Sequence, residues 1–303
     1  MSSVDERELD EVRVIEEGLG AAYDRNTKRV VEAFDKLKEF ARRLIYLDVS
    51  AEHELDAKAL IVAMGDIGKI TAENRMEIAS VAASRALGEV CLEAASQERE
   101  ALTIKALSVL GNLSRELAGK GLDRAAKSAA EYLGTFGKAA ARSKKEDHVS
   151  LADIYLMQLA SKALDEHLQE TGPVAAGLLG EVGAVSAGQA LEESAMGAAI
   201  LLEDLGAAAV RNKHEPLVKA VIHAFGLLGE AFSLQEQKSA LVQAAWSLET
   251  IRLLALEYGM KTAAREAKVV LDSLKTAGIL DEEQNLEKIQ DLRNFHQRIL
   301  KKS

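Results

Sequence analysis

One large apolar residue recurs every 23 positions through most of the chain. A second apolar residue follows it three positions later, and a third residue, usually Ala, precedes it by four. Because each helical residue advances by about 100°, these three positions lie on one face of a helix. The interval therefore predicts one helix and one turn per 23 residues. The series comprises Met64, Leu87, Leu110, Leu133, Leu156, Leu179, Leu202, Phe225, Leu248 and Leu271.

Helix breaks recur at the same interval. Pro173 and Pro216 each stand where the first turn of a helix is expected, where a missing N–H costs nothing. Earlier breaks predict helices over 4–22, 28–47 and 51–71, and apolar residues at helical spacing predict a last helix over 282–301. The chain is thus expected to form about thirteen helices. The polar or glycine-containing breaks lie at 72–75, 96–98, 119–121, 142–147, 169–173, 187–189, 211–215, 233–237, 258–261 and 280–283.

Glycine often follows the large apolar residue directly. Glycine inside a helix costs about 1 kcal/mol of stability relative to Ala. Its recurrence at one position of the 23-residue period therefore indicates a compensating gain in stability. We expect that gain to be the close approach of a neighbouring helix. The glycines at this position are Gly65, Gly88, Gly111, Gly134, Gly180 and Gly226, and the pattern is broken by Met157, Glu203, Glu249 and Asp272.

A single helix of this length cannot bury its apolar stripe alone, whereas stacked antiparallel pairs can. Two 23-residue units make a 46-residue helical hairpin, a length typical of helical repeat proteins. We therefore expect an all-α fold, a right-handed α–α solenoid of antiparallel helices that forms one elongated domain over 1–303. Capping helices are expected at 1–50, regular repeats at 51–280 and a C-terminal capping helix at 281–303.

Three segments resemble a known repeat family. Met64–Gly68, Leu133–Gly137 and Leu179–Gly183 are similar to the Ala-Leu-Gly-x-Ile-Gly helix of HEAT-like repeats. The resemblance covers roughly 51–280 and implies a HEAT or armadillo type of solenoid. The proline between helices and the Asp-Val-Arg sequence that are typical of HEAT-like repeats do not recur in this chain.

The overall charge restricts the classes of partner. A formal net charge of −10 and a pI near 5.3 disfavour nonspecific binding to nucleic acid, which needs clustered basic residues. A single cysteine, Cys91, cannot form an internal disulfide, and no signal peptide is visible, so a cytoplasmic location is expected. The apolar segment 172–191 is rich in Gly and Ala, which favours a buried helix over a membrane span.

No arrangement of residues predicts catalysis, a metal ion or a cofactor. The six histidines are scattered and show no His-Glu-x-x-His or Glu-x-x-His spacing. His148 and His167 fall near predicted helix ends, where a surface imidazole is expected. Cys91 occupies a small packing position and is predicted to be an inert buried residue. The sequence therefore favours a protein that is not an enzyme.

Charge is segregated along the sequence. Residues 115–145 contain eight basic and three acidic side chains, whereas 146–206 contain eleven acidic side chains and one basic one. In a stacked array this order would place a basic zone beside an acidic one. The candidate partner-binding residues are the basic Lys120, Arg124, Lys127, Lys138, Arg142, Lys144 and Lys145, the acidic Glu192, Glu193, Glu203 and Asp204, and Trp246, which points away from the central stripe.

These features favour a scaffold whose exposed face binds a protein or peptide. Head-to-tail association between copies would use the same charge pattern. Two alternatives stay open: a DNA-acting glycosylase of the HEAT-like type that uses the basic segment 115–145, and a membrane-surface or cytoskeletal adaptor built as an Ala-rich helical bundle. The acidic balance of the whole chain argues against the first, and 23-residue units are short for the second.

Overall fold

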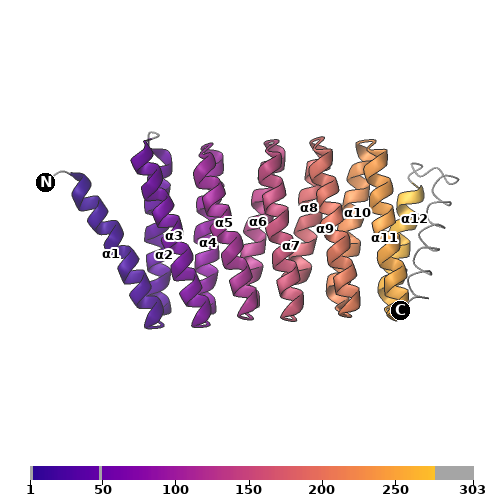
Figure 1. Ribbon diagram of the computed structural model, residues 1–303, viewed down its shortest axis with the longest axis horizontal. Coiled ribbons are helices and arrows are strands. Elements are labelled where there is room, and N and C mark those ends of the chain that lie inside the picture. The colour runs from indigo at the N-terminus through magenta and orange to yellow at the C-terminus, as the bar shows by residue number, and fades with distance from the viewer. Residues whose placement is uncertain (1–2, 48–49, 277–303) are drawn as a thin grey trace, which may run out of the picture.

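The computed structural model describes residues 3–47 and 50–276, and every regular element in these ranges is an α-helix. The helices stand side by side in a row along the long axis (Figure 1). The predicted all-α array with a 23-residue period is confirmed, while the helix predicted over 282–301 lies outside the described residues. The described helices are α1 Ser3–Tyr23, α2 Thr27–Tyr46, α3 Ala51–Glu73, α4 Glu77–Ser96, α5 Glu100–Gly119, α6 Asp123–Arg142, α7 Glu146–Asp165, α8 Thr171–Gly188, α9 Glu192–Arg211, α10 Glu215–Leu234, α11 Lys238–Glu257 and α12 Lys261–Thr276.

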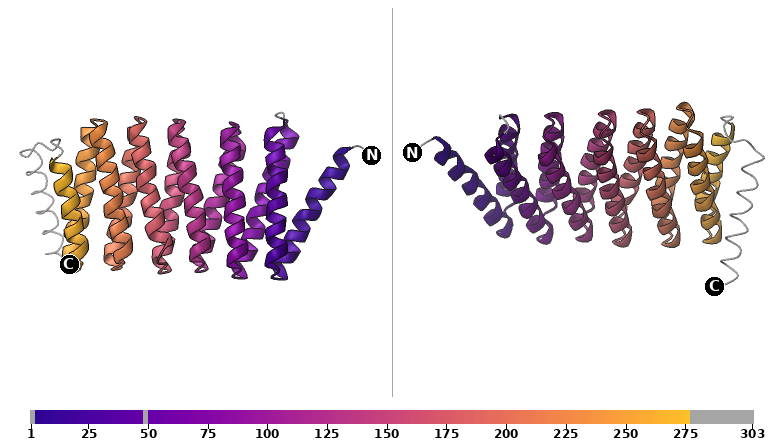
Figure 2. Two further views of the ribbon diagram at one scale, coloured as in Figure 1. Left: turned by 180° about the vertical axis from the view of Figure 1, so that it is seen from behind. Right: turned by 45° about the horizontal axis from the view of Figure 1, so that its top comes forward.

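The helices form two layers. Each helix packs against its neighbours in the chain and against the helix two places further along, so odd-numbered helices form one layer and even-numbered helices the other. The two faces of the array are seen from opposite sides in Figure 1 and Figure 2. At the N-terminal end, α1 leans away from the rest of the row (Figure 1). Consecutive helices therefore belong to opposite layers, and residues 46 positions apart occupy equivalent places in the same layer.

One turn geometry is used repeatedly between the helices. From the turn after α3 onwards, every described turn has one residue with a left-handed backbone conformation. These residues are 23 positions apart, as the sequence period predicts. The next residue donates its N–H to a carbonyl five positions back, as Met76 does to Thr71 at 2.8 Å, which is the Schellman pattern. Only two of these left-handed positions are glycine. The residues are Arg75, Glu98, Gly121, Lys144, His167, Ala190, Lys213, Glu236 and Gly259.

Acidic residues at helix starts connect neighbouring helices of one layer. Glu77 accepts a hydrogen bond from the backbone N–H of Arg124, and Glu192 accepts one from the hydroxyl of Ser239. Asp123 accepts the N–H and the hydroxyl of Thr171, which fixes the start of α8 slightly later than the 23-residue period predicts. A carboxylate at a helix N-terminus also interacts favourably with the helix dipole.

The periodic apolar residues form the core. All ten members of the 23-residue series are buried, as the sequence predicted. The glycines that follow them receive a side chain from the next helix of the same layer: Tyr132 packs over Gly88 and Tyr155 over Gly111, each closer than a Cβ would permit. Glycine is thus required here because a neighbouring side chain fills the space of its missing Cβ.

The apolar segment 172–191, predicted as a buried helix, covers most of α8 and the turn after it, and α8 packs between α6 and α10. Among the described residues, one helix, α10, has the length and composition needed to cross a membrane. Half of its apolar window is buried inside the protein, as in the core helices of soluble proteins, so this is weak evidence for a membrane span.

Candidate interaction surface

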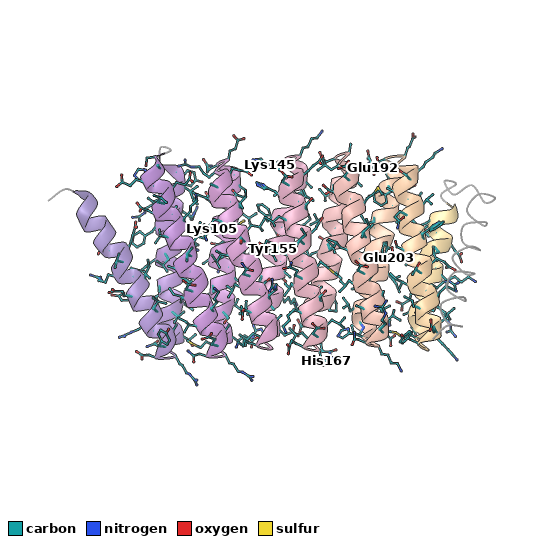
Figure 3. The ribbon with its side chains drawn as sticks, viewed as in Figure 1. Lys105, Lys145, Tyr155, His167, Glu192 and Glu203 are labelled. Atoms are coloured by element: carbon teal, nitrogen blue, oxygen red, sulfur yellow. The ribbon has the colours of Figure 1, made fainter. Side chains whose placement is uncertain are left out.

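The structure does not gather the predicted basic residues into one patch. Arg124, Lys127, Lys138 and Arg142 lie on α6 in the even layer. Lys120 belongs to the turn after α5, whereas Lys144 and Lys145 belong to the turn after α6, at the opposite end of the helices. Figure 3 shows Lys145 at the upper ends of the helices and His167 at their lower ends, with Tyr155 between them.

Three of these basic side chains, Lys145 among them, pair with acidic residues of the neighbouring repeat. Lys127 lies 2.8 Å from Glu170, and Lys138 lies 2.6 Å from Glu181. The hydrogen bond to Glu170 and its negative charge raise the pKa of Lys127. Two of these pairs, Lys127 with Glu170 and Lys138 with Glu181, join the basic segment to the acidic one through contacts between adjacent repeats.

His148 is not the surface histidine that the sequence predicted. It is buried at the start of α7 beside the ring of Phe136, and its Nε2 lies 2.6 Å from a carboxylate oxygen of Glu100 on α5. Partial desolvation raises the pKa of Glu100, but the hydrogen bond with His148 and the charge of Lys145 outweigh it, so the pKa is lowered overall. The sequence could not show this, because the partner is 48 residues away. His167 is exposed in its turn, as predicted.

The predicted acidic residues all lie on α9, in the odd layer. Glu192, Glu193 and Asp204 are exposed and Glu203 is partly exposed. Glu192 and Glu203 accept hydrogen bonds from Ser239 and Ser247 of α11. Glu203 occupies a position where glycine was expected. The small Ser247 stands opposite it, where a larger side chain faces the glycine in most other repeats, Ala224 opposite Gly180 being the exception. The break in the pattern is therefore compensated by a polar contact between helices.

An exposed apolar row crosses the odd layer. Ile154 on α7 and Ile200 on α9 are 43% and 51% exposed, and Trp246 is partly exposed at the equivalent position of α11. We call these three residues the apolar ridge. Sequence reasoning identified only Trp246. The signal for the other two is that they stand two residues before the periodic Leu156 and Leu202, as Trp246 does before Leu248.

Polar and charged residues dominate the corresponding row of the even layer, which carries Arg85, Glu131, Gly177, His223 and Val269. The two layers also differ in total charge. The six described odd-numbered helices carry 24 Asp and Glu against 10 Lys and Arg, a net charge of −14, whereas the even helices carry 13 against 16, a net of +3. The odd layer is thus the strongly acidic face.

The glycine at the centre of the ridge has no packing partner. A Cβ on Gly197 would meet no atom within 4 Å, although this residue lies inside α9 one turn before Ile200 and Leu201. The equivalent positions on α7 and α11 carry Leu151 and Gln243, so Gly197 leaves a notch between them. Most other helical glycines are explained by a neighbouring side chain, and this one is not.

The described residues offer little for chemistry. They contain no group of three His, Cys, Asp or Glu side chains that could hold a metal ion. Cys91 is fully buried as predicted, and burial raises the pKa of its thiol. A shallow hollow of about 530 Å³ between α1, α3 and α5 is lined mainly by aliphatic residues, among them Ile15, Leu19 and Val62.

No protein-family model matches the chain, and no curated protein is significantly similar to it. Among solved structures it is similar to a circular tandem repeat protein, described as having a novel repeat topology and enhanced subunit contact surfaces. The identity is 17%, the match covers 93% of this chain and 72% of the other, and the TM-score is 0.48. The chain is an all-helical repeat protein that resembles this one.

Proposed function

We propose that the protein is a scaffold without catalytic activity that binds a protein or peptide on the odd-layer face. The supporting observation is the apolar ridge. Exposed large apolar residues at one register of successive helices, bordered by charge, are typical of interaction sites. The even layer has mainly charged, polar and small residues at this register, which is why we assign binding to one face rather than to the whole array.

We extend the proposal to the type of helical repeat, the cellular location and the classes of partner. A HEAT- or armadillo-like repeat accounts for the 46-residue hairpins, and such solenoids present extended surfaces to partners. A cytoplasmic location and the lack of cofactor, nucleic acid and membrane partners remain predictions from composition. Head-to-tail self-association also remains a prediction, and because Lys127 and Lys138 pair within the chain, it has fewer charges available than the sequence suggested.

The test compares binding partners after changing one face at a time. In one variant, Ile154→Asp and Ile200→Asp place charge on the apolar ridge. In the control, His223→Asp and Val269→Asp change exposed residues at the same register of the even layer. Cross-linking and mass spectrometry in the native cell should show partners that are retained by the control and lost from the ridge variant. Identical partner sets for both variants would refute the proposal.

A further inference from the structure

We infer that the partner of the apolar ridge is a basic amphipathic helix that lies across α7, α9 and α11 and makes its closest approach at Gly197. This inference rests on the proposed function and adds the chemistry and the conformation of the partner. Three features support it: the spacing of the ridge, the charge beside it and the unexplained glycine.

The spacing of the ridge fits a helix. Neighbouring helices of one layer are about 8–10 Å apart, so Ile154, Ile200 and Trp246 repeat at that interval. Seven residues of a helix rise about 10.5 Å and return to nearly the same face, so apolar residues at i, i+7 and i+14 would meet the three ridge residues in turn. In an extended strand, residues on one face repeat about every 6.6 Å. Neither this distance nor twice it matches the interval of about 8–10 Å between ridge residues.

The acidic residues beside the ridge favour a basic partner. On α9, Glu193 lies seven residues before Ile200 and Asp204 four residues after it, so both carboxylates share the exposed face of the helix with the ridge. On α7, Asp147 stands at the equivalent place before Ile154 and is exposed. Lys or Arg on both flanks of an apolar stripe would meet these acids. The same acids disfavour the anionic surface of most membranes and of nucleic acid.

Gly197 points to a close approach by that partner. Inside an exposed helix face, glycine costs about 1 kcal/mol relative to Ala, and here none of the described residues uses the space of the missing Cβ. A partner that lies in the notch would use it. Gly177 provides a matched comparison, since it also lies inside a helix with no atom within 4 Å of the place that a Cβ would take, but on α8 in the even layer.

Trp246 allows binding to the ridge to be measured by fluorescence. It is the single tryptophan of the chain and belongs to the ridge, and its indole N–H is buried without an acceptor among the described residues. A partner on the ridge should therefore shift its fluorescence emission. The probe is a helical peptide of about 21 residues without tryptophan, long enough to span the three ridge helices, with Leu at every seventh position and Lys on both flanks. A second peptide carries Glu in place of each Lys.

The basic peptide should shift the Trp246 emission with saturation, and added salt should weaken its binding, because the flanking charges are exposed. The acidic peptide should not bind. Gly197→Ala should raise the melting temperature of the protein yet weaken binding of the basic peptide about tenfold. Gly177→Ala should raise the melting temperature similarly and leave the affinity unchanged.

Three outcomes would overturn the inference: no binding of the basic peptide, equal binding of both peptides, or an unchanged affinity after Gly197→Ala. The same emission shift with neutral phosphatidylcholine vesicles in place of the peptide would also overturn it and would assign the ridge to a lipid surface. None of these outcomes decides the proposed function, which fails only if changing the ridge leaves the cellular partners unchanged.

Discussion

Individual residues in this array are constrained by neighbours 44 or 45 positions away. Gly180 is the sharpest case, because a Cβ there would lie 2.8 Å from the Cα of Ala224 on the next helix of the layer and closer still to its Cβ. Backbone cannot move aside as a flexible side chain can. The identity of this residue is therefore set by the distance between α8 and α10.

Gly180→Ala is expected to destabilise the protein by about 1–3 kcal/mol, since overpacking outweighs the gain in helix propensity. Gly177→Ala in the same helix should instead stabilise it by up to about 1 kcal/mol, because its Cβ meets no neighbour. Denaturant unfolding followed by circular dichroism measures both. If the two variants changed stability in the same direction, the packing argument would be wrong.

Asp153 is a buried carboxyl group whose Oδ1 has no hydrogen-bond partner among the described residues. Burial raises its pKa well above the usual value, so the folded state holds a proton more tightly than the unfolded state. Its contribution to stability is therefore most favourable below the unfolded pKa and is lost as the pH rises through the folded pKa. The equivalent position in several other repeats is Ala, as at Ala176 and Ala199.

Asp153→Ala should raise the free energy of unfolding at neutral pH by about 1–3 kcal/mol, which is the cost of a buried polar group without a partner. The gain should shrink as the pH approaches about 4, where the carboxyl group is increasingly protonated in both states. Urea unfolding of both proteins across this pH range measures the difference. A gain that did not depend on pH would show that the charge of Asp153 is not its cause.

At the scale of elements, the turns are more regular in conformation than in sequence. Their left-handed residue is non-glycine in most repeats, although such a residue pays about 1 kcal/mol or more in this region. Residues such as Ala190, at φ 61°, adopt it because the Schellman hydrogen bonds and the packing of two helices fix the turn. Sequence breaks thus located the turns without glycine at each one.

Ala190→Gly is expected to stabilise the protein by about 0.5–1 kcal/mol, because glycine enters the left-handed region without steric cost. The reciprocal change, Gly121→Ala at φ 73°, should destabilise it by a similar amount. Thermal unfolding of the two variants tests this pair. Equal melting temperatures for Ala190→Gly and the unchanged protein would contradict it.

For the whole molecule, the structural unit of the array is a hairpin of 46 residues, because only this length returns the chain to the same layer. Removal of residues 122–167 would take out α6 and α7 and join equivalent turn positions. Gly88 would then face Leu178 and Gly111 would face Leu201, both smaller than the tyrosines that they replace.

This deletion is expected to give a shorter folded array that unfolds cooperatively, since each repeat contacts only its neighbours. Removal of residues 122–144 alone should not, because every later helix would move to the opposite layer and lose contacts within its own layer such as that of His148 with Glu100. Circular dichroism and size-exclusion chromatography distinguish the two results. A folded product from the shorter deletion would show that the layers are interchangeable.

By itself, the sequence determined the elements and their period. Helix length, turn position and the buried stripe are set by residues that are close together in the sequence. They recur with the 23-residue spacing of Leu133, Leu156 and Leu179. The sequence also marked Trp246 and the acidic residues of α9 as candidate contacts. It could do so because periodicity states which residues of one helix share a face.

Only the tertiary structure decided which helices share a layer. That assignment pairs Lys138 with Glu181 and His148 with Glu100, separates the basic residues of 115–145, and aligns Ile154 with Ile200 and Trp246. Charge consequently differs between the two faces of the array as well as along its length. The physical reason is that alternate helices pack together, so contacts join residues about 46 positions apart that no local pattern connects.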